Sequence, residues 1–170
     1  MEKMTPLTAM ALQEVKRWHT RRVDRDQTVA SHTASMMALA LVLAEPHNLI
    51  SLDLCDLMQL VLVHDAHETV FGDCSYPARM ALKALGIDID GICRKTFWGG
   101  VDPYDKVSPL VRNLVDVADQ VEAAMWSQRN APNLAAQVVA QAVETSRQLL
   151  DNQGQAQVLE MLGIRPEVDR

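Results

Sequence analysis

Apolar residues recur every three or four positions along most of this chain, a spacing that places them on one face of an α-helix. The segments 28–44 and 51–64 show this spacing most clearly. No segment shows the sustained alternation of apolar and polar residues that is typical of a half-buried strand. The pattern therefore predicts an all-α helical bundle, and the 170 residues are expected to form a single domain over 1–170.

Capping and helix-breaking residues predict where these helices begin and end. Thr5 followed by Pro6 is typical of a helix start, and we expect this first helix to run to about Trp18. The polar segment 19–27 is expected to be a loop or a frayed helix end. Further helices are expected at 28–44, from 51, and at about 77–85, 88–98, 108–129, 132–150 and 155–162.

Composition and charge exclude several classes of protein. Aromatic residues make up only 4% of the chain, which favours helix over sheet. The net charge of −6 argues against a partner that is a nucleic-acid polymer, but it leaves room for a local basic pocket. Cys55, Cys74 and Cys93 are odd in number and far apart, which indicates free thiols and a cytoplasmic protein. No signal pattern and no apolar run of the roughly 20 residues of a membrane span is visible, so no membrane contact is expected.

Histidine and acidic residues recur at positions that suit a metal site. The densest group begins with His64 and Asp65 and continues with Glu68, one helical turn after His64. His32 lies upstream of this group and Asp119 lies downstream. Two imidazoles and two carboxylates form a mixed nitrogen and oxygen set of the kind that binds a divalent transition metal.

The helical spacing turns these side chains toward the core. His32 shares an apolar stripe with Val29 and Met36, and Asp119 lies beside the apolar stripe of its own helix. A lone histidine on such a face is usually a hydrogen-bonded core residue, whereas several buried carboxylates require a compensating cation. The whole set therefore predicts a metal centre and, as the leading hypothesis, a metal-dependent hydrolase.

The order of these residues resembles the HD-domain phosphohydrolase superfamily, in which His32, His64–Asp65 and Asp119 match the ligand pattern. The longer pattern His-Asp-x-x-Glu-x-x-x-Gly-Asp, which starts at His64, is similar to the 5′-deoxynucleotidase branch. Arg17–Trp18 matches an Arg-Trp pair that precedes the first ligand in that branch. The match runs from about Arg17 to Trp126 and implies the helical bundle of that superfamily.

The resemblance implies the metal ligands and the cofactor. His32, His64, Asp65 and Asp119 would bind a divalent transition metal, for which Zn, Co, Mn and Fe are all compatible. It also implies a homo-oligomer, which in the phage type of this branch is a hexamer.

Two acidic residues are candidates for catalysis. Glu68 would orient or deprotonate the attacking water. Alternatively, it would form a hydrogen bond to a ligand histidine. Asp73 would protonate the leaving 5′ oxygen or hold the sugar. Alternatively, Asp73 would act as the N-cap of the helix expected near Pro77.

Basic and aromatic residues are candidates for binding the substrate. Arg17 and Arg79 would hold phosphate through paired hydrogen bonds. Trp18 would stack on the base, and its alternative is a core or interface aromatic. The basic run Arg21, Arg22 and Arg25 is expected to be a solvated face or a further phosphate contact.

The branch contains two types of enzyme, which act on different substrates but break the same P–O5′ bond. One is a bacterial type that acts on deoxynucleoside monophosphates, and the other is a compact phage type that splits dATP into deoxyadenosine and triphosphate. This chain is short, and its segment Cys74–Arg79 stands where the bacterial type has a Pro-Thr-Pro-Val-Lys run. We therefore expect the phage type, a small-molecule deoxynucleotide as partner, and action in the host cytoplasm. The alternatives are a 5′-deoxynucleotidase and a catalytically inactive nucleotide-binding module.

Overall fold

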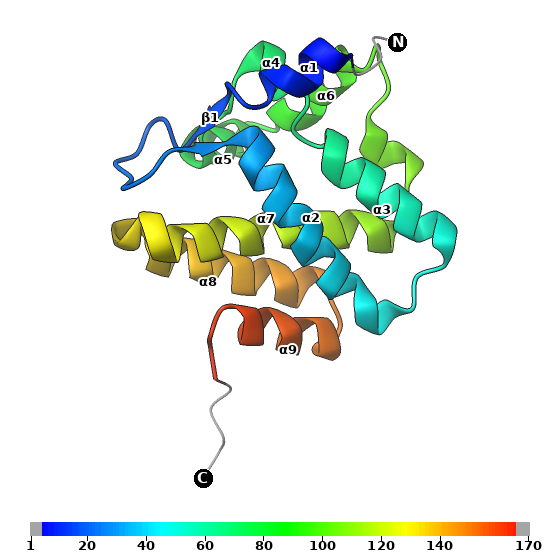
Figure 1. Cartoon of the computed structure of the whole chain (residues 1–170), viewed down its shortest axis with the longest axis vertical. Coiled ribbons are helices and arrows are strands. Elements are labelled where there is room, and N and C mark those ends of the chain that lie inside the picture. Colours follow the sequence, from blue (N-terminus) through cyan, green and yellow to red (C-terminus); the bar gives the residue numbers. More distant parts are fainter. Residues whose placement is uncertain (1–4, 166–170) are drawn as a thin grey trace.

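The computed structural model describes residues 5–165 (Figure 1). Helix α7 (Pro109–Asn130), which has 22 residues, lies at the centre of the main helical body. Around it pack α2 (Val29–Ala44), α3 (Ser51–Val63), α8 (Pro132–Leu149) and α9 (Asn152–Met161). Helices α7 and α8 run side by side, and α2 crosses them (Figure 1).

A group of shorter helices lies at the end of the molecule away from α9 (Figure 1). It comprises α1 (Pro6–Ala11), α4 (Glu68–Phe71), α5 (Tyr76–Ala84) and α6 (Ile89–Phe97). The 3-10 turns η1 (Glu45–His47) and η2 (Pro103–Lys106) follow α2 and precede α7, respectively. The predicted all-α class is confirmed.

The apolar stripes of the long helices meet in one continuous core. On α7 the buried positions recur at helical spacing, at Val111, Leu114, Val115, Ala118 and Val121. They pack with the buried residues of α2 and α3, which are Met36, Ala40, Leu43, Leu57, Leu60 and Val61. Burial of one such large side chain stabilises the fold by roughly 1.5–3 kcal/mol. This core therefore fixes the helices that carry the candidate site.

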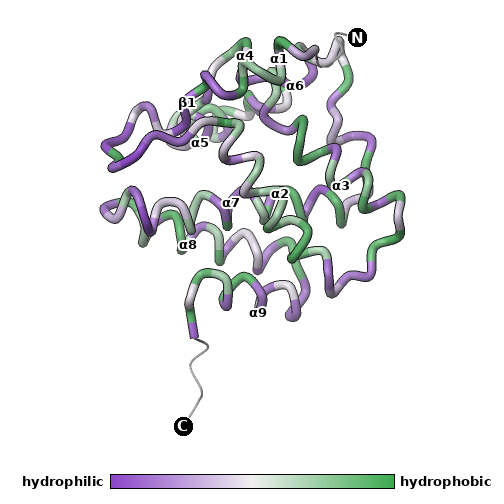
Figure 2. Tube along the Cα trace, viewed as in Figure 1, coloured by the Kyte–Doolittle hydropathy of each residue, from purple (hydrophilic) through white to green (hydrophobic). Residues whose placement is uncertain are grey.

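A small antiparallel sheet replaces the end of the first predicted helix. Strand β1 (Lys16–Arg17) pairs with β2 (Gln27–Thr28), with Arg17 opposite Gln27. The expectation of a helix up to Trp18 is wrong, because α1 ends at Ala11. A strand of two residues is too short to show a period of two, so the sequence pattern gave no signal. The segment between the strands is mostly hydrophilic (Figure 2).

Helix α9 begins earlier than predicted. The sequence pattern placed its start near residue 155, whereas the helix starts at Asn152. The side chain of Asp151 accepts a hydrogen bond from the backbone N–H of Gly154, so it acts as the N-cap. This cap lies just after α8, and α9 folds back against α8 (Figure 1).

The segment Val29–His47 has the length and mean hydropathy of a membrane span, although the sequence analysis expected none. In the structure its buried face is formed by residues such as Met36, Ala40 and Leu43, which pack into the core. A buried helix of a globular protein meets the same criteria of length and composition. Burial of these residues accounts for part of the apolar character of α2, since 39% of the segment is buried.

Candidate active site

His32 is positioned by the first turn of α2. Thr28 and Ser31 form a capping box, in which each side chain bonds the backbone N–H of the other residue. This cap fixes where the helix starts, one turn before His32. The His32 side chain is fully buried, and its Nε2 atom lies 3.1 Å from Oδ1 of Asp119.

His64 and Asp65 lie at the end of α3. His64 Nδ1 is 2.6 Å from the carbonyl oxygen of Val61, and a carbonyl oxygen can only accept. Nδ1 therefore carries the proton, and the lone pair of Nε2 is free to bind a cation. Oδ2 of Asp65 lies 3.0 Å from this Nε2 atom and 3.7 Å from Nε2 of His32.

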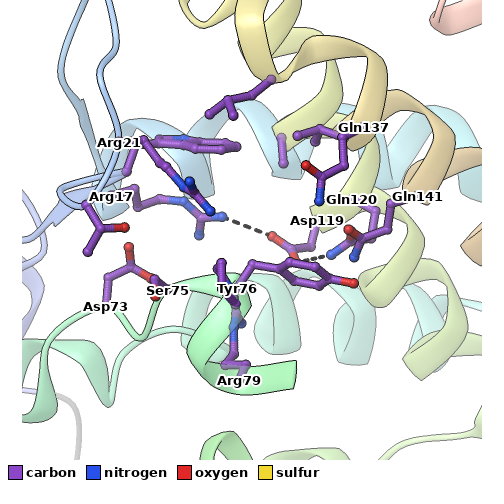
Figure 3. A pocket seen from close by; sticks show the side chains of 16 residues that line it. Arg17, Arg21, Asp73, Ser75, Tyr76, Arg79, Asp119, Gln120, Gln137 and Gln141 are labelled. Carbon is purple, nitrogen blue, oxygen red and sulfur yellow. Dashed lines mark hydrogen bonds and ion pairs between the residues drawn. The ribbon is translucent and has the colours of Figure 1, made fainter. Parts of the chain in front are cut away.

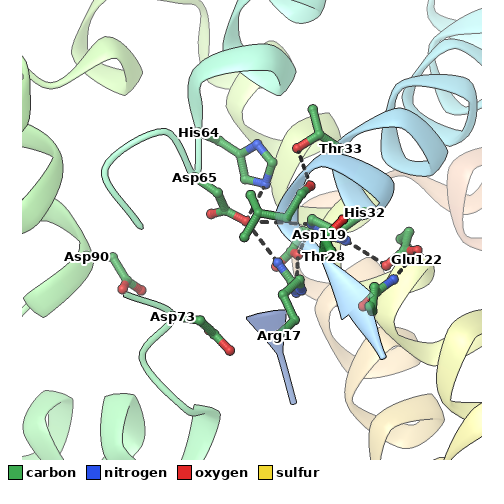
Figure 4. A network of polar contacts seen from close by, with 12 residues as sticks. Arg17, Thr28, His32, Thr33, His64, Asp65, Asp73, Asp90, Asp119 and Glu122 are labelled. Atoms are coloured by element: carbon green, nitrogen blue, oxygen red, sulfur yellow. Dashed lines mark hydrogen bonds and ion pairs between the residues drawn. The ribbon is translucent and has the colours of Figure 1, made fainter. Parts of the chain in front are cut away.

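Asp119 of α7 completes the cluster (Figure 4). One potential ligand atom from each of His32, His64 and Asp119 lies within 4.8 Å of the others. Gln120 donates a hydrogen bond to Oδ2 of Asp119 at 3.0 Å, which leaves Oδ1 facing His32. Three helices and a turn thus bring together the four side chains that the sequence analysis assigned to a metal.

The donor atoms of this cluster fit a metal. Within residues 5–165, the buried Nε2 atoms of both His32 and His64 lack a hydrogen-bond partner. Unpaired buried polar atoms are costly, and a divalent cation between them would satisfy both nitrogens. With the adjacent carboxylates of Asp65 and Asp119, the set offers nitrogen and oxygen ligands to one ion. The cluster is a possible metal-binding site.

Arg17 lies against the carboxylates of the cluster (Figure 4). Its guanidinium donates to Oδ2 of Asp65 at 2.8 Å and to Oδ1 of Asp119 at 3.4 Å. Burial acts to raise the pKa of both carboxyl groups, but both pKa values lie below the ordinary range, and the charge of Arg17 contributes to lowering each of them. Both aspartates are therefore charged and ready to act as ligands at neutral pH.

Glu68 lies in the first turn of α4 and is only 5% exposed. Burial, followed by the charge of Asp65, raises the pKa of Glu68 to about 10. Its Oε2 atom has no hydrogen-bond partner in the described part of the chain. Nor does the Glu68 side chain bond to His32 or His64 there, so the alternative of a hydrogen bond to a ligand histidine lacks support.

The raised pKa of Glu68 predicts a pH-dependent stability in the metal-free protein. Above pH 4.5 the unfolded chain releases a proton that the folded chain keeps until about pH 10. Stability that is present below pH 4.5 is therefore lost as pH rises, by at most about 1.4 kcal/mol for each pH unit. Glu68→Gln removes this titration, so its melting temperature relative to wild type should rise with pH.

Thermal unfolding in the presence of a chelator at about pH 5, 7 and 9 measures this effect. Any fixed cost of the new amide is the same at each pH and does not disturb the trend. A difference between Glu68→Gln and wild type that stays constant across this range would contradict the assigned environment of Glu68.

A pocket opens beside the cluster (Figure 3). Its lining includes the side chains that the sequence analysis assigned to the substrate, Arg17, Trp18 and Arg79, together with Asp73 and Asp119. The same pocket also contains residues that the sequence analysis did not identify: Tyr76, Gln120, Gln137 and Gln141. Gln137 and Gln141 lie one turn apart on α8, and no signal in the sequence separated them from other polar residues of that helix.

Asp73 faces this pocket from the loop before α5. Its side chain is 10% exposed, and His19 Nδ1 lies 3.6 Å from its Oδ2 atom. The N-cap position of α5 belongs to Ser75, and no described side chain caps this helix. The alternative in which Asp73 caps the helix is therefore wrong, and the pocket position agrees with a role toward the substrate.

Trp18 is a packed aromatic residue and also lies at the pocket, so its position agrees with both roles considered for it. Its ring stacks on Trp126 of α7, with centroids 5.3 Å apart and planes 13° apart, and it also lines the pocket. Its backbone has a φ of 62°, a left-handed conformation that ends strand β1 and sends the chain into the following loop. Trp18 is thus a packed aromatic that leaves part of its surface to the cavity.

The arginines contribute unequally to the pocket. Arg79 of α5 lines it and also bonds Oδ2 of Asp90 at 3.3 Å. From the basic run, Arg21 lines the pocket (Figure 3), whereas Arg25 lines a second pocket, to which Glu122 also contributes. Arg17, Arg21 and Arg79 therefore bring positive charge to one cavity of an acidic protein.

Comparison with known proteins places this geometry in a family. Residues 9–86 match the family model described as HD domain. The chain is therefore similar to HD domains over this segment, and the likeness covers somewhat less than half of its length. The matched segment contains His32, His64 and Asp65, and Asp119 lies beyond it on α7.

Proteins similar to this chain include one from a phage. The chain is 29% identical over 133 residues to a dATP triphosphohydrolase of Salmonella phage PMBT28, a match that covers 74% of this chain and 67% of the phage protein. The cyanophage S-2L HD phosphohydrolase (DatZ), solved with dA and one catalytic Zn²⁺ ion, aligns with a TM-score of 0.79. That match has 18% identity and covers 96% of each chain. A structural-genomics crystal structure aligns with a TM-score of 0.60 at 19% identity, over 96% of this chain and 95% of the other.

Proposed function

We propose that this HD domain is a metal-dependent phosphohydrolase that splits dATP into deoxyadenosine and triphosphate. The observation that carries the proposal is the His32, His64 and Asp119 cluster, which shares Asp119 with a pocket that arginines also line. The reaction breaks the P–O5′ bond: the oxygen of water bonds to phosphorus, and the 5′ oxygen leaves with a proton. A sequence relative is named for this activity.

His32, His64, Asp65 and Asp119 are the residues that would hold the metal. A bound divalent transition ion lowers the pKa of water and polarises a phosphoryl oxygen. Zn²⁺ is the ion of the cyanophage neighbour, and it suits the same mixed set of nitrogen and oxygen ligands. Co, Mn and Fe are the other ions that this donor set accepts.

Glu68 acts as the base toward the attacking water. It lies one turn beyond His64, and its buried Oε2 atom is free to accept the proton of water. A neighbouring cation favours the charged form of the carboxyl group, which is the form that accepts a proton. Asp73, on the opposite loop of the pocket, donates a proton to the leaving 5′ oxygen or holds the sugar hydroxyl.

Arg17, Arg21 and Arg79 hold the triphosphate. Guanidinium groups bind phosphate oxygens through two parallel hydrogen bonds, and three of them match the high charge of a triphosphate. The base lies against Trp18 and the apolar side chains of Leu134 and Val138.

Two glutamines border the part of the pocket that would receive the base. The amides of Gln137 and Gln141 point toward the cavity in Figure 3 and offer both donors and acceptors to the edge of the base. A bound adenine would thus meet an apolar surface on its face and amide groups on its edge.

A product assay tests the proposal. We expect metal-loaded protein to release triphosphate and deoxyadenosine from dATP, and chelator to stop the reaction. Release of orthophosphate from dAMP alone would instead indicate a 5′-deoxynucleotidase. No cleavage of mono- or triphosphates of any of the four bases would leave a nucleotide-binding module and refute the enzyme.

The proposal places the enzyme in the cytoplasm of a host cell, where nucleotide pools are found. We also propose that it works as a homo-oligomer, as its resemblance to the phage type implies. Light scattering of the purified protein tests this point, and a monomer at micromolar concentration would contradict it.

A further inference from the structure

We propose that Glu122 is a positioning residue that holds His32 for the metal, and that Gln27 links this pair to the pocket wall at Trp18. The inference rests on the proposed function. The role of Glu122 depends only on the metal site, whereas the test of the link through Gln27 depends also on the proposed deoxyadenosine moiety of the substrate. Neither Glu122 nor Gln27 was assigned a role from the sequence.

The contact between Glu122 and His32 is short and buried. Nδ1 of His32 lies 2.6 Å from Oε2 of Glu122, and Glu122 is only 3% exposed. A carboxylate oxygen accepts hydrogen bonds, so Nδ1 carries a proton and Nε2 is left as the nitrogen that would bind the metal. Nε2 is the atom that faces Asp119 across the candidate metal site. Such a carboxylate partner fixes the ring orientation and makes the imidazole a better ligand.

Gln27 bonds the second oxygen of Glu122. Its Nε2 atom donates to Oε1 of Glu122 at 2.8 Å, and Gln27 is 3% exposed. The amide oxygen of Gln27 accepts a hydrogen bond from the indole N–H of Trp18, also at 2.8 Å. Since an indole nitrogen can only donate, this bond forces the amide oxygen toward Trp18 and the amide nitrogen toward Glu122. Each member of the series therefore fixes the orientation of the next.

The hydrogen-bonded series from Trp18 through Gln27 and Glu122 to His32 connects two parts of the site. Trp18 lines the pocket that would hold the nucleotide, and His32 belongs to the metal cluster. Pairing of β1 with β2 keeps the two ends in register, because Gln27 lies opposite Arg17, the residue before Trp18. A ligand that orders Trp18 would therefore also order Gln27, Glu122 and the ring of His32.

Metal affinity tests the role of Glu122 without any measurement of catalysis. Zn²⁺ is titrated into metal-stripped protein in competition with a chromogenic chelator. We expect Glu122→Gln to bind Zn²⁺ about 10–100-fold more weakly than wild type. Glu122→Asp keeps the charge at a greater distance and should fall between the two. The matched control is Glu144→Gln on the exposed face of α8, which should bind Zn²⁺ as wild type does.

Two results would overturn the role of Glu122. One is wild-type Zn²⁺ affinity in Glu122→Gln that keeps the wild-type circular dichroism spectrum. The other comes from nitrogen-15 NMR of unaltered metal-free protein, where a proton on Nε2 of His32 instead of Nδ1 would contradict the geometry even if the variants fail to fold. A wild type that cleaves no nucleotide, yet loses Zn²⁺ affinity on Glu122→Gln, would refute the proposed function and leave this inference standing.

The link through Gln27 has its own test. Deoxyadenosine, which contains no phosphate to be cleaved, serves as the probe. We expect it to increase the Zn²⁺ affinity of wild type at least about fivefold, and Zn²⁺ to strengthen deoxyadenosine binding by the same factor. Gln27→Met is similar in size but cannot bond both neighbours, so this coupling should disappear. An unchanged coupling in Gln27→Met, or none in wild type, would overturn the link.

Discussion

Asp65→Ala should abolish both metal binding and nucleotide cleavage. Oδ2 of Asp65 lies among three partners, at 3.0 Å from Nε2 of His64, 3.7 Å from Nε2 of His32 and 2.8 Å from Arg17. Its loss removes a proposed ligand and leaves the positive charge of Arg17 less compensated beside a bound cation. Metal-ion catalysis supplies several kcal/mol of transition-state stabilisation, so kcat should fall at least about 10³-fold.

The measurement pairs triphosphate release with the metal content of protein purified without chelator. Asp24→Ala, which removes an exposed aspartate from the loop between the strands, is the control and should retain both properties. Circular dichroism of Asp65→Ala separates loss of the site from loss of the fold. Intact cleavage and an undiminished metal content in Asp65→Ala would refute the metal centre.

Glu68→Gln should lower kcat by about 10²–10⁴-fold while the metal stays bound. The amide has nearly the shape of the carboxyl group, but it cannot accept a proton from water. In the described structure Glu68 bonds neither proposed ligand histidine, so its substitution should leave the ligands in place. The Michaelis constant should change little, because the loss concerns the reacting water and not the binding of the nucleotide.

Metal content again separates the possibilities for Glu68. A joint loss of metal and activity in Glu68→Gln would show that Glu68 is a ligand, and an unchanged kcat would exclude it as the base. Glu160→Gln, on the exposed side of α9, is the matched control and should behave as wild type. This neutral-pH experiment is independent of the stability trend predicted for metal-free Glu68→Gln.

The charge balance around Arg17 explains how the acidic cluster persists in the core. Burial by itself would favour the neutral forms of Asp65 and Asp119, but the adjacent charge of Arg17 favours their charged forms. Glu68 forms no ion pair within residues 5–165, and burial together with the charge of Asp65 raises its pKa despite the positive charge of Arg17. Two kinds of carboxyl group therefore lie within one site, and their difference matches the separate roles of ligand and base.

Helical periodicity was sufficient to predict most of the fold and the core of the site. His32 and His64 occur on apolar stripes, and a stripe at helical spacing must face the interior whatever the neighbouring helices are. The Ser108–Pro109 pair at the start of α7 likewise acts within a few positions, so this helix start could be recognised locally. The grouping of His32, His64, Asp65 and Asp119 was expected because an isolated buried carboxylate is too costly.

Local sequence patterns could not identify contacts between side chains that are distant in the sequence. Glu122 bonds His32 across 90 residues, and Arg17 bonds Asp119 across 102 residues, so neither partner is visible from its own surroundings in the sequence. Gln27 lies in a segment expected to be a loop and acquires its role only when β1 pairs with β2. Spacing along a helix specifies which side chains are buried, because that depends on neighbours one turn away. Which buried groups meet depends on how distant helices cross, and that is a property of the packed core.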